Sequence, residues 1–157
     1  MSESSTARVA KAAADMGLDV EITIMPASTR TAAEAATACG CKVAQIVKSL
    51  VFQRADNDAL VLLLIAGDRR VDPAASAPVI GSEIVKADPN RVRLETGFAI
   101  GGVAPIGHLA PLPVYMDLSL LAYDTVWAAA GAPNAVFQIP PAQLQAVTSA
   151  IPLAVDA

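Results

Sequence analysis

A run of seven apolar residues at positions 60–66 (LVLLLIA) constrains the fold more than any other feature of this sequence. Because the run has no polar face, it predicts a strand that is buried on both sides, in the middle of a sheet. It is far too short to span a bilayer, which takes roughly 20 residues. The turn-forming residues 54–58 (RADND) separate it from a second strand-like stretch at 45–52, and this arrangement predicts an antiparallel hairpin.

Helix start and stop signals surround this hairpin. Thr31 and Glu34 match a capping box, and Gly40 is placed to end the helix that follows. Two Asp-Pro pairs, at 72–73 and 88–89, each offer an N-cap with proline at the first helical position. Further helices are expected at 7–16 and 140–149, and further strands at 20–25, 113–116, 125–129, 135–139 and 151–155. Because these elements alternate without a regular βαβ order, the pattern predicts an α+β fold with a mixed sheet.

Length and charge narrow the function classes. The 157 residues suit one domain, spanning 1–157, with residues 1–5 expected to be frayed. Eleven basic and fifteen acidic residues give a net charge of −4, which excludes a general polyanion binder with a basic face. The N-terminus has neither the basic nor the apolar region of a signal peptide, so we expect a cytoplasmic protein with no membrane or DNA partner.

The sequence has few residues that could bind a metal or carry out redox chemistry. One histidine and two cysteines cannot build a four-ligand zinc site, so we expect no metal and no cofactor. Cys39 and Cys41 could be a redox pair, but the spacing favours packing around a glycine that ends a helix.

Lys48 is the most informative single side chain. Alternation along its strand puts it on the same face as Ile46, Leu50 and Phe52. A lysine on an apolar face is costly to bury unless it meets an anion or reaches solvent. In one interpretation its stem packs while the ammonium reaches water. In the other, the ammonium holds a phosphate or a developing oxyanion at the mouth of a pocket.

The glycine- and proline-rich segment 101–107 (GGVAPIG) is the second candidate. Its backbone N–H groups could be preorganised to bind an oxyanion or a ribose hydroxyl, or the segment could be an ordinary tight loop. His108 follows it, as a candidate general base or as a loop histidine without a role.

Asp117 could be a site carboxylate, although an N-cap explains it equally well. Trp127 and Phe137 are expected in the core, on facing strands.

Six short motifs occur in a specific order along the chain. They are TAAEAA at 31–36, QIVKSLVF at 45–52, GDRRV at 67–71, TGFAIGGVAPIG at 96–107, LPVYMD at 112–117 and AG at 130–131. In this order and spacing the sequence resembles the YbaK/EbsC family, also called the prolyl-tRNA synthetase-associated domain. The resemblance covers about residues 5–155 and implies a curved, nearly barrel-like mixed sheet surrounded by helices.

The resemblance also implies an activity. Members of that family are aminoacyl-tRNA deacylases, which hydrolyse the ester bond of mischarged tRNA in trans. The implied catalytic residues are Lys48, Gly101 and Gly102, and the implied substrate-binding residues are Thr96, Gly97, Val103, Ala104 and Pro105, with His108 added by its position after the loop. The implied mechanism is substrate-assisted and needs no metal, and the partners are the acceptor end of mischarged tRNA and an aminoacyl-tRNA synthetase. A non-catalytic module that binds nucleotide or aminoacyl-adenosine is the alternative, and the amino acid removed is left open.

Overall fold

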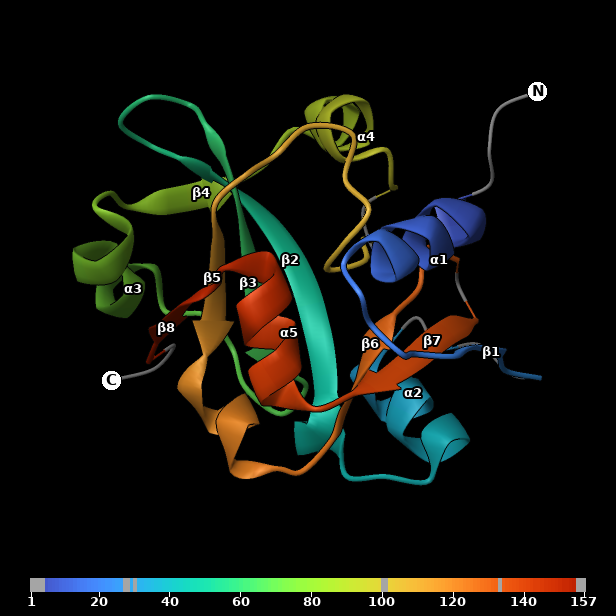
Figure 1. The fold of residues 1–157 in the computed structure, drawn as a ribbon. Coiled ribbons are helices and arrows are strands. Elements are labelled where there is room, and N and C mark those ends of the chain that lie inside the picture. Colours follow the sequence, from blue (N-terminus) through green and yellow to red (C-terminus); the bar gives the residue numbers. More distant parts are fainter. Residues whose placement is uncertain (1–4, 27–28, 30, 100–101, 133, 155–157) are drawn as a thin grey trace.

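The apolar run forms strand β3 (Leu60–Ala66) in a mixed eight-stranded sheet, and each of its residues is buried, as predicted. The computed structural model describes residues 5–26, 29, 31–99, 102–132 and 134–154. Strand β2 (Ile46–Arg54) runs antiparallel to β3 with Lys48 opposite Ile65, so the predicted hairpin is confirmed. Figure 1 shows β2 as a long, curved strand through the middle of the molecule.

The remaining strands extend this hairpin on both sides. They are β1 (Ile22–Ile24), β4 (Ile84–Lys86), β5 (Val114–Asp117), β6 (Val126–Ala129), β7 (Ala135–Ile139) and β8 (Ile151–Leu153). Their order is β1-β7-β6-β2-β3-β5-β8, and β4 pairs with the far end of β2. The pairs β2–β6, β3–β5 and β5–β8 are parallel and the others are antiparallel, which confirms the mixed sheet. The short β4 has no counterpart among the predicted strands.

The helices that follow Thr31, Asp72 and Asp88 begin and end where the capping signals predict. The first helix begins at Ser5, which was expected to be frayed, and residues 1–4 lie outside the described residues. The helices are α1 (Ser5–Asp15), α2 (Ala32–Cys39), α3 (Pro73–Ile80), α4 (Pro89–Thr96) and α5 (Pro141–Thr148), with 3-10 turns η1 (Val43–Gln45) and η2 (Leu118–Ala122). The Thr31 hydroxyl accepts a hydrogen bond from the Glu34 N–H at 3.1 Å, which completes the capping box. No helix in the described ranges is both long enough and apolar enough to cross a membrane.

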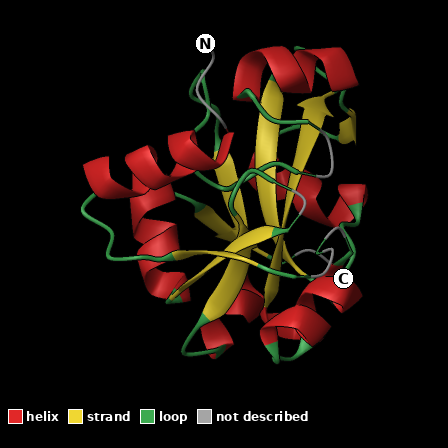
Figure 2. Cartoon of the chain, turned by 90° about the vertical axis from the view of Figure 1, so that its right-hand side faces the viewer, coloured by secondary structure: helices red, strands yellow, loops and turns green. Residues whose placement is uncertain are grey.

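The helices cover both faces of the sheet, and Figure 2 shows them on either side of the strands. On one face, Val9 of α1 and Leu144 of α5 join a core that includes Leu62 and Leu64 of β3. On the other face, Ile80 of α3 packs with the alternate β3 residues. Helix α2 packs against Ile46 at the start of β2, on the face of the sheet that α3 also covers. Alternation along β3 therefore supplies both halves of the core.

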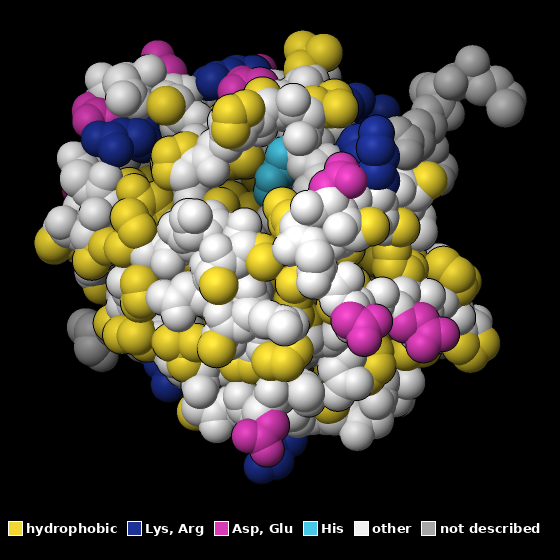
Figure 3. Space-filling view, viewed as in Figure 1, with side chains coloured by type: hydrophobic (Ala, Val, Ile, Leu, Met, Phe, Trp, Pro, Cys, Tyr) yellow, Lys and Arg dark blue, Asp and Glu magenta, His cyan; other side chains and the backbone are white. Residues whose placement is uncertain are grey.

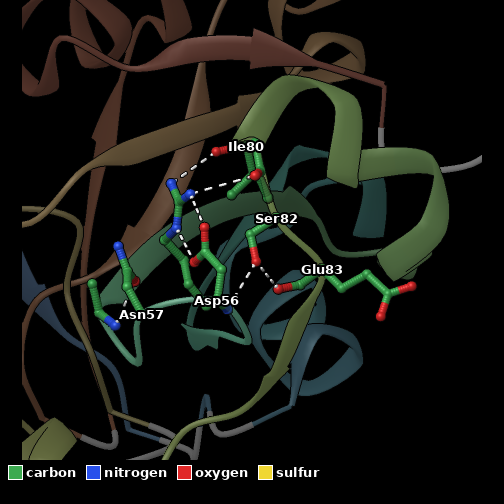
Figure 4. Close-up of polar contacts among 8 residues, drawn as sticks. Asp56, Asn57, Ile80, Ser82 and Glu83 are labelled. Carbon is green, nitrogen blue, oxygen red and sulfur yellow. Dashed lines mark hydrogen bonds and ion pairs between the residues drawn. The ribbon is translucent and has the colours of Figure 1, made fainter.

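A polar cluster fixes the turn of the central hairpin. The Arg54 guanidinium donates to both carboxylate oxygens of Asp56, at 2.9 and 2.7 Å, and to the Ile80 carbonyl at the end of α3, at 2.9 Å. The Asp56 N–H in turn donates to the Ser82 hydroxyl at 3.3 Å, a contact drawn in Figure 4. The hydrogen bonds from Arg54 lower the pKa of the Asp56 carboxyl to about 2. The hairpin turn is thereby joined to the loop that follows α3.

Asp117 is a buried carboxylate with two main-chain donors. It is 1% exposed. One of its oxygens accepts from the Ala66 N–H at 3.1 Å and the other from the Ser119 N–H at 2.9 Å, where Asp117 caps η2. The N-cap interpretation is therefore confirmed, and the bond from the Ala66 N–H ties the end of β3 to the end of β5.

We expect Asp117→Ala to destabilise the protein by about 2–4 kcal/mol. Loss of an N-cap costs about 0.5–2 kcal/mol, and a buried N–H left without a partner costs about 1–3 kcal/mol. Asp117→Asn keeps one acceptor oxygen and should cost about half as much. Urea unfolding of the three proteins measures the difference, and an Asp117→Ala protein as stable as the wild type would contradict this account.

Candidate active site

One edge of strand β2 pairs with β3. The opposite edge is paired only at its two ends. Ile46 and Val47 pair with β6, and residues 52–54 pair with β4. Between them, no strand of the described chain pairs with residues 48–51 on that edge. The sheet is therefore open at this point.

Main-chain groups of β2 face this open edge. The Arg54 N–H donates to the Ala59 carbonyl at 2.8 Å, so Arg54 is bonded across the hairpin to the β3 side. Because the direction of main-chain groups alternates along an antiparallel strand, the N–H and C=O of Ser49 and Val51 point away from β3. These groups form a short template of donors and acceptors that a ligand can use.

A cavity of about 240 Å³ lies at the open edge. Its walls come from β2, α2, the β6–β7 pair and the glycine-rich loop, and they include Lys48, Ser49, Ala35, Trp127 and Val103. The structure therefore brings together the predicted Lys48 and one predicted loop residue, Val103, which are 55 positions apart in the sequence.

The Lys48 ammonium, on a partly buried side chain, has a protein acceptor. Its Nζ donates to the Arg69 carbonyl at 2.5 Å. Burial lowers the pKa of the Lys48 ammonium, and the charge of Arg70 lowers it further. The carboxylates of Asp68 and Asp117 act in the opposite direction. A positioned, partly desolvated cation at a cavity wall can interact strongly with an anion or a polarised carbonyl.

The glycine-rich loop is only partly directed at the cavity. Gly101 lies outside the described residues. The Gly102 N–H donates to the Ala99 carbonyl at 2.9 Å, so it is already engaged in a turn. A Cβ built on Gly102 would meet only that carbonyl, at 3.7 Å, which leaves room for a side chain. Val103, buried at the cavity wall, is the loop's described contribution to the lining.

Thr96 and Gly97 lie at the base of the loop, where α4 ends. Thr96 is fully buried, and its hydroxyl donates to the Val92 carbonyl at 2.6 Å and accepts from the Phe98 N–H at 3.1 Å. Gly97 adopts φ +81° as the C-cap of α4. Neither residue lines the 240 Å³ cavity, so both hold the loop rather than face that space.

His108 and Pro105 line a different, more open groove of about 370 Å³, between α1, α5 and the loop. The histidine is visible in Figure 3 as the cyan side chain within a hollow on that face. Its Nε2 is 2.7 Å from the carbonyl oxygen of Ala104, a buried loop residue, so Nε2 carries the proton in this contact. The structure does not bring His108 to the same cavity as Lys48.

The cysteines occupy the end of α2. Cys39 is the last helical residue and Gly40 adopts a left-handed C-cap with φ +70°, as predicted. Both thiols are free. Burial, together with the neighbouring Cys41, raises the pKa of Cys39 to about 11, and burial also raises the pKa of Cys41. Thiols kept protonated in this way are poor nucleophiles, which favours the packing interpretation.

Comparison with known proteins identifies the family. The sequence profile of the aminoacyl-tRNA editing domain matches residues 26–147. The chain belongs to this family. The match spans every described residue that lines the 240 Å³ cavity.

Two relatives of this editing-domain chain come from Bacillus subtilis and Moorella thermoacetica. The uncharacterised protein YwhH of Bacillus subtilis (strain 168) is 35% identical over 124 residues, covering 79% of this chain and 78% of YwhH. The proline–tRNA ligase of Moorella thermoacetica is 35% identical over 92 residues, 58% of this chain but 16% of the ligase.

Solved structures confirm the predicted fold class. A proposed trans-editing enzyme for prolyl-tRNA synthetase superposes with a TM-score of 0.92 at 43% identity, covering 100% of this chain and 99% of that one. A second structure, of a hypothetical protein, gives a TM-score of 0.86 at 29% identity over 94% of this chain and 98% of that chain.

Trp127 and Ser49 are editing-domain cavity residues that pattern reasoning did not assign to the site. Trp127 and Phe137 were expected in the core on facing strands. Strands β6 and β7 do pair and Phe137 is buried, but Trp127 is only partly buried, because it lies at the wall of the cavity. The Ser49 Oγ is buried and has no hydrogen-bond partner among the described residues. A small polar residue next to Lys48 was the only signal in the sequence.

The neutral state of His108 predicts a pH dependence of stability. Burial lowers the pKa of the His108 imidazole, and the nearby Arg8 charge lowers it as well, although the bond to Ala104 opposes the shift. The unfolded chain therefore binds more protons than the folded chain as the pH falls below about 6.5, and stability is lost there. Asp56 titrates below this window.

We expect wild-type protein to lose more stability than His108→Gln between about pH 7.5 and about pH 5, which bracket the ordinary histidine pKa. Glutamine keeps a donor for the Ala104 carbonyl but cannot titrate. Urea midpoints at the two pH values measure the effect. Equal losses in both proteins would show that His108 does not control this transition.

Proposed function

We propose that this chain is an aminoacyl-tRNA deacylase that hydrolyses the ester bond of mischarged tRNA in trans, with residues 1–157 acting as one unit in the cytoplasm. The observation that carries the proposal is the placement of Lys48 beside an unpaired strand edge, in a cavity whose lining includes Val103 of the glycine-rich loop. Membership of the editing-domain family and the likeness to a proposed trans-editing enzyme support it.

The cavity offers suitable partners for an aminoacyl ester. A cavity of about 240 Å³ has room for a small aminoacyl group with part of the terminal ribose. The Ser49 N–H, directed at the open edge, is a donor for the ester carbonyl oxygen, and the Ser49 Oγ is a second polar contact. Since the Gly102 N–H already donates to the Ala99 carbonyl, the loop contributes the shape of the cavity through Val103 in this proposal.

In this scheme Lys48 binds the phosphate of the terminal nucleotide or polarises the ester. A water oxygen attacks the carbonyl carbon, and the resulting oxyanion is held by N–H donors and the lysine charge. Collapse of the tetrahedral intermediate breaks the bond between the carbonyl carbon and the ribose oxygen, and that oxygen takes a proton originating from the water. The vicinal ribose hydroxyl orients the attacking water, so the scheme needs no protein base.

Charge limits how the chain meets tRNA. Its net charge is −4, and affinity for a polyanion grows with the number of phosphates neutralised. Arg70, exposed and close enough to Lys48 to lower its pKa, is the cation best placed to add a phosphate contact. We therefore propose that recognition is confined to the acceptor end, with an aminoacyl-tRNA synthetase as a second partner.

The second candidate function is a non-catalytic module that binds aminoacyl-adenosine in the same cavity. The partly buried Trp127 at the cavity wall favours it, because an indole face can stack on a base without any chemistry. Incubation with a panel of tRNAs charged with different amino acids separates the two functions. Release of a free amino acid supports the enzyme, whereas saturable binding without release supports the module.

We expect Lys48→Met to abolish most of the deacylation while changing stability little. Charge-assisted hydrogen bonds contribute about 1.5–3 kcal/mol each, which is roughly 10- to 150-fold in rate at 1.4 kcal/mol per decade. Loss of the bond to Arg69 is offset by removal of a partly desolvated charge, so stability should change by no more than about 1 kcal/mol.

Single-turnover hydrolysis and a thermal melt of each variant measure these effects. Lys48→Arg should restore only part of the rate, because a planar guanidinium does not replace a compact ammonium. Full activity in Lys48→Met, whatever its melting temperature, would overturn the role given to this lysine.

We also expect deacylation to survive prolonged incubation with EDTA. The reason is the donor set, since no cluster of three or more His, Cys, Asp or Glu side chains suited to a metal occurs in the described chain. Activity that is lost on chelation and restored by added zinc would contradict this expectation.

The double variant Cys39→Ala, Cys41→Ala should retain turnover within about threefold of the wild type, because protonated packing thiols take no part in the chemistry.

A further inference from the structure

We propose that Arg8, on helix α1, is a positioning residue for the deacylation site, through the two ends of the glycine-rich loop. This inference rests on the proposed function. Arg8 makes two long-range hydrogen bonds: its Nε donates to the Gly107 carbonyl at 2.8 Å, and its Nη2 donates to the Gly97 carbonyl at 2.8 Å. One guanidinium therefore joins two points of the loop that are ten residues apart in sequence.

A third contact fixes the guanidinium itself. Its central carbon lies 4.5 Å from the centroid of the Phe98 ring, within the range of a cation–π interaction. Phe98 is 2% exposed and packs in the same core as Val103 and Ile106. Its ring also meets His108 edge to face, with centroids 5.9 Å apart. The Arg8 side chain is thus held by an immobile core residue and two main-chain acceptors.

The two glycines are adapted to this contact. Gly97 and Gly107 have φ of +81° and +84°, values that side chains disfavour. A Cβ on Gly97 would lie 2.5 Å from Arg8 Nη2, and a Cβ on Gly107 would lie 3.4 Å from the Arg8 carbonyl oxygen. A side chain at Gly97 would therefore collide with the guanidinium, whereas at Gly107 the space is ordinary and the positive φ alone favours glycine.

The loop that Arg8 holds at Gly97 and Gly107 contributes to the cavity wall. Between the two anchored glycines lies Val103, which lines the cavity together with Lys48. Backbone bonds at the loop base, from Leu109 to Thr96 and from Ala110 to Glu95, do not involve Arg8. They hold the loop to the fold when Arg8 is removed, so Arg8 sets the position of the loop rather than its attachment.

The test compares Arg8→Met with Arg54→Met. Arg54 is a matched control, since it also donates to two carbonyls at a helix end, those of Ile80 and Gly81. Arg54 also donates to Asp56, one of the residues labelled in Figure 4, and it does not line the cavity. Both substitutions remove a bidentate arginine, but only one of them touches the loop.

We expect Arg8→Met to lower kcat by about 10- to 100-fold with little change in KM, because a misplacement of about 1 Å can cost two orders of magnitude in rate. Arg54→Met should lower the melting temperature and leave kcat unchanged. Arg8→Lys should recover only part of the rate, since an ammonium lacks the fork that spans two acceptors. Added guanidinium at a non-denaturing concentration should partly rescue Arg8→Ala.

Amide hydrogen exchange of residues 102–106 provides a readout that does not depend on catalysis, and it should accelerate in Arg8→Met but not in Arg54→Met. Equal kcat and equal exchange in Arg8→Met and wild type would overturn the inference. If the wild type itself released no amino acid from any tRNA of the panel, the proposed function would fail instead. Faster loop exchange in Arg8→Met would then still support the positioning of the loop.

Discussion

The unequal pairing of strand β2 is the constraint on which the site depends. Along one edge the strand is bonded to β3 over seven consecutive residues, whereas along the other it is paired only at its ends. The complete pairing holds Lys48 and Ser49 in a rigid strand, and the incomplete pairing leaves their main chain open to a ligand. A backbone edge normally has to be covered because it pairs with other chains. Here α2, β6 and the glycine-rich loop surround it, so it becomes the wall of a cavity.

The second consequence of this arrangement is electrostatic. Lys48 lies on the sheet face that packs against α3, where its neighbours Leu50 and Phe52 join an apolar cluster. The ammonium avoids full desolvation by bonding to the Arg69 carbonyl, at the point where the chain leaves β3. Sheet pairing and a main-chain acceptor therefore place one cation at the wall of the cavity, in a chain that is acidic overall.

Local signals determined how much of this could be predicted. The hairpin, the caps at Thr31, Asp72 and Asp88, and the glycine stops depend on neighbours within a few residues, and the structure confirms them. Lys48 was found because a lysine breaks an apolar alternation. Trp127 was expected in the core but lies at the cavity wall, because the other walls come from parts of the chain that are distant in sequence. The Arg8 contacts, between residues about 90 and 99 positions apart, left no signal in any window of the sequence.

Helix α1 lies before the N-terminal boundary of the editing-domain profile. The family profile begins at residue 26, and every cavity-lining residue lies after that point. A chain trimmed to that boundary would keep the whole lining yet lose the arginine that joins the two ends of the loop. A graft defined by the cavity alone would transfer the lining without the two hydrogen bonds from Arg8. Under the proposed role of Arg8, the unit to transfer begins with helix α1.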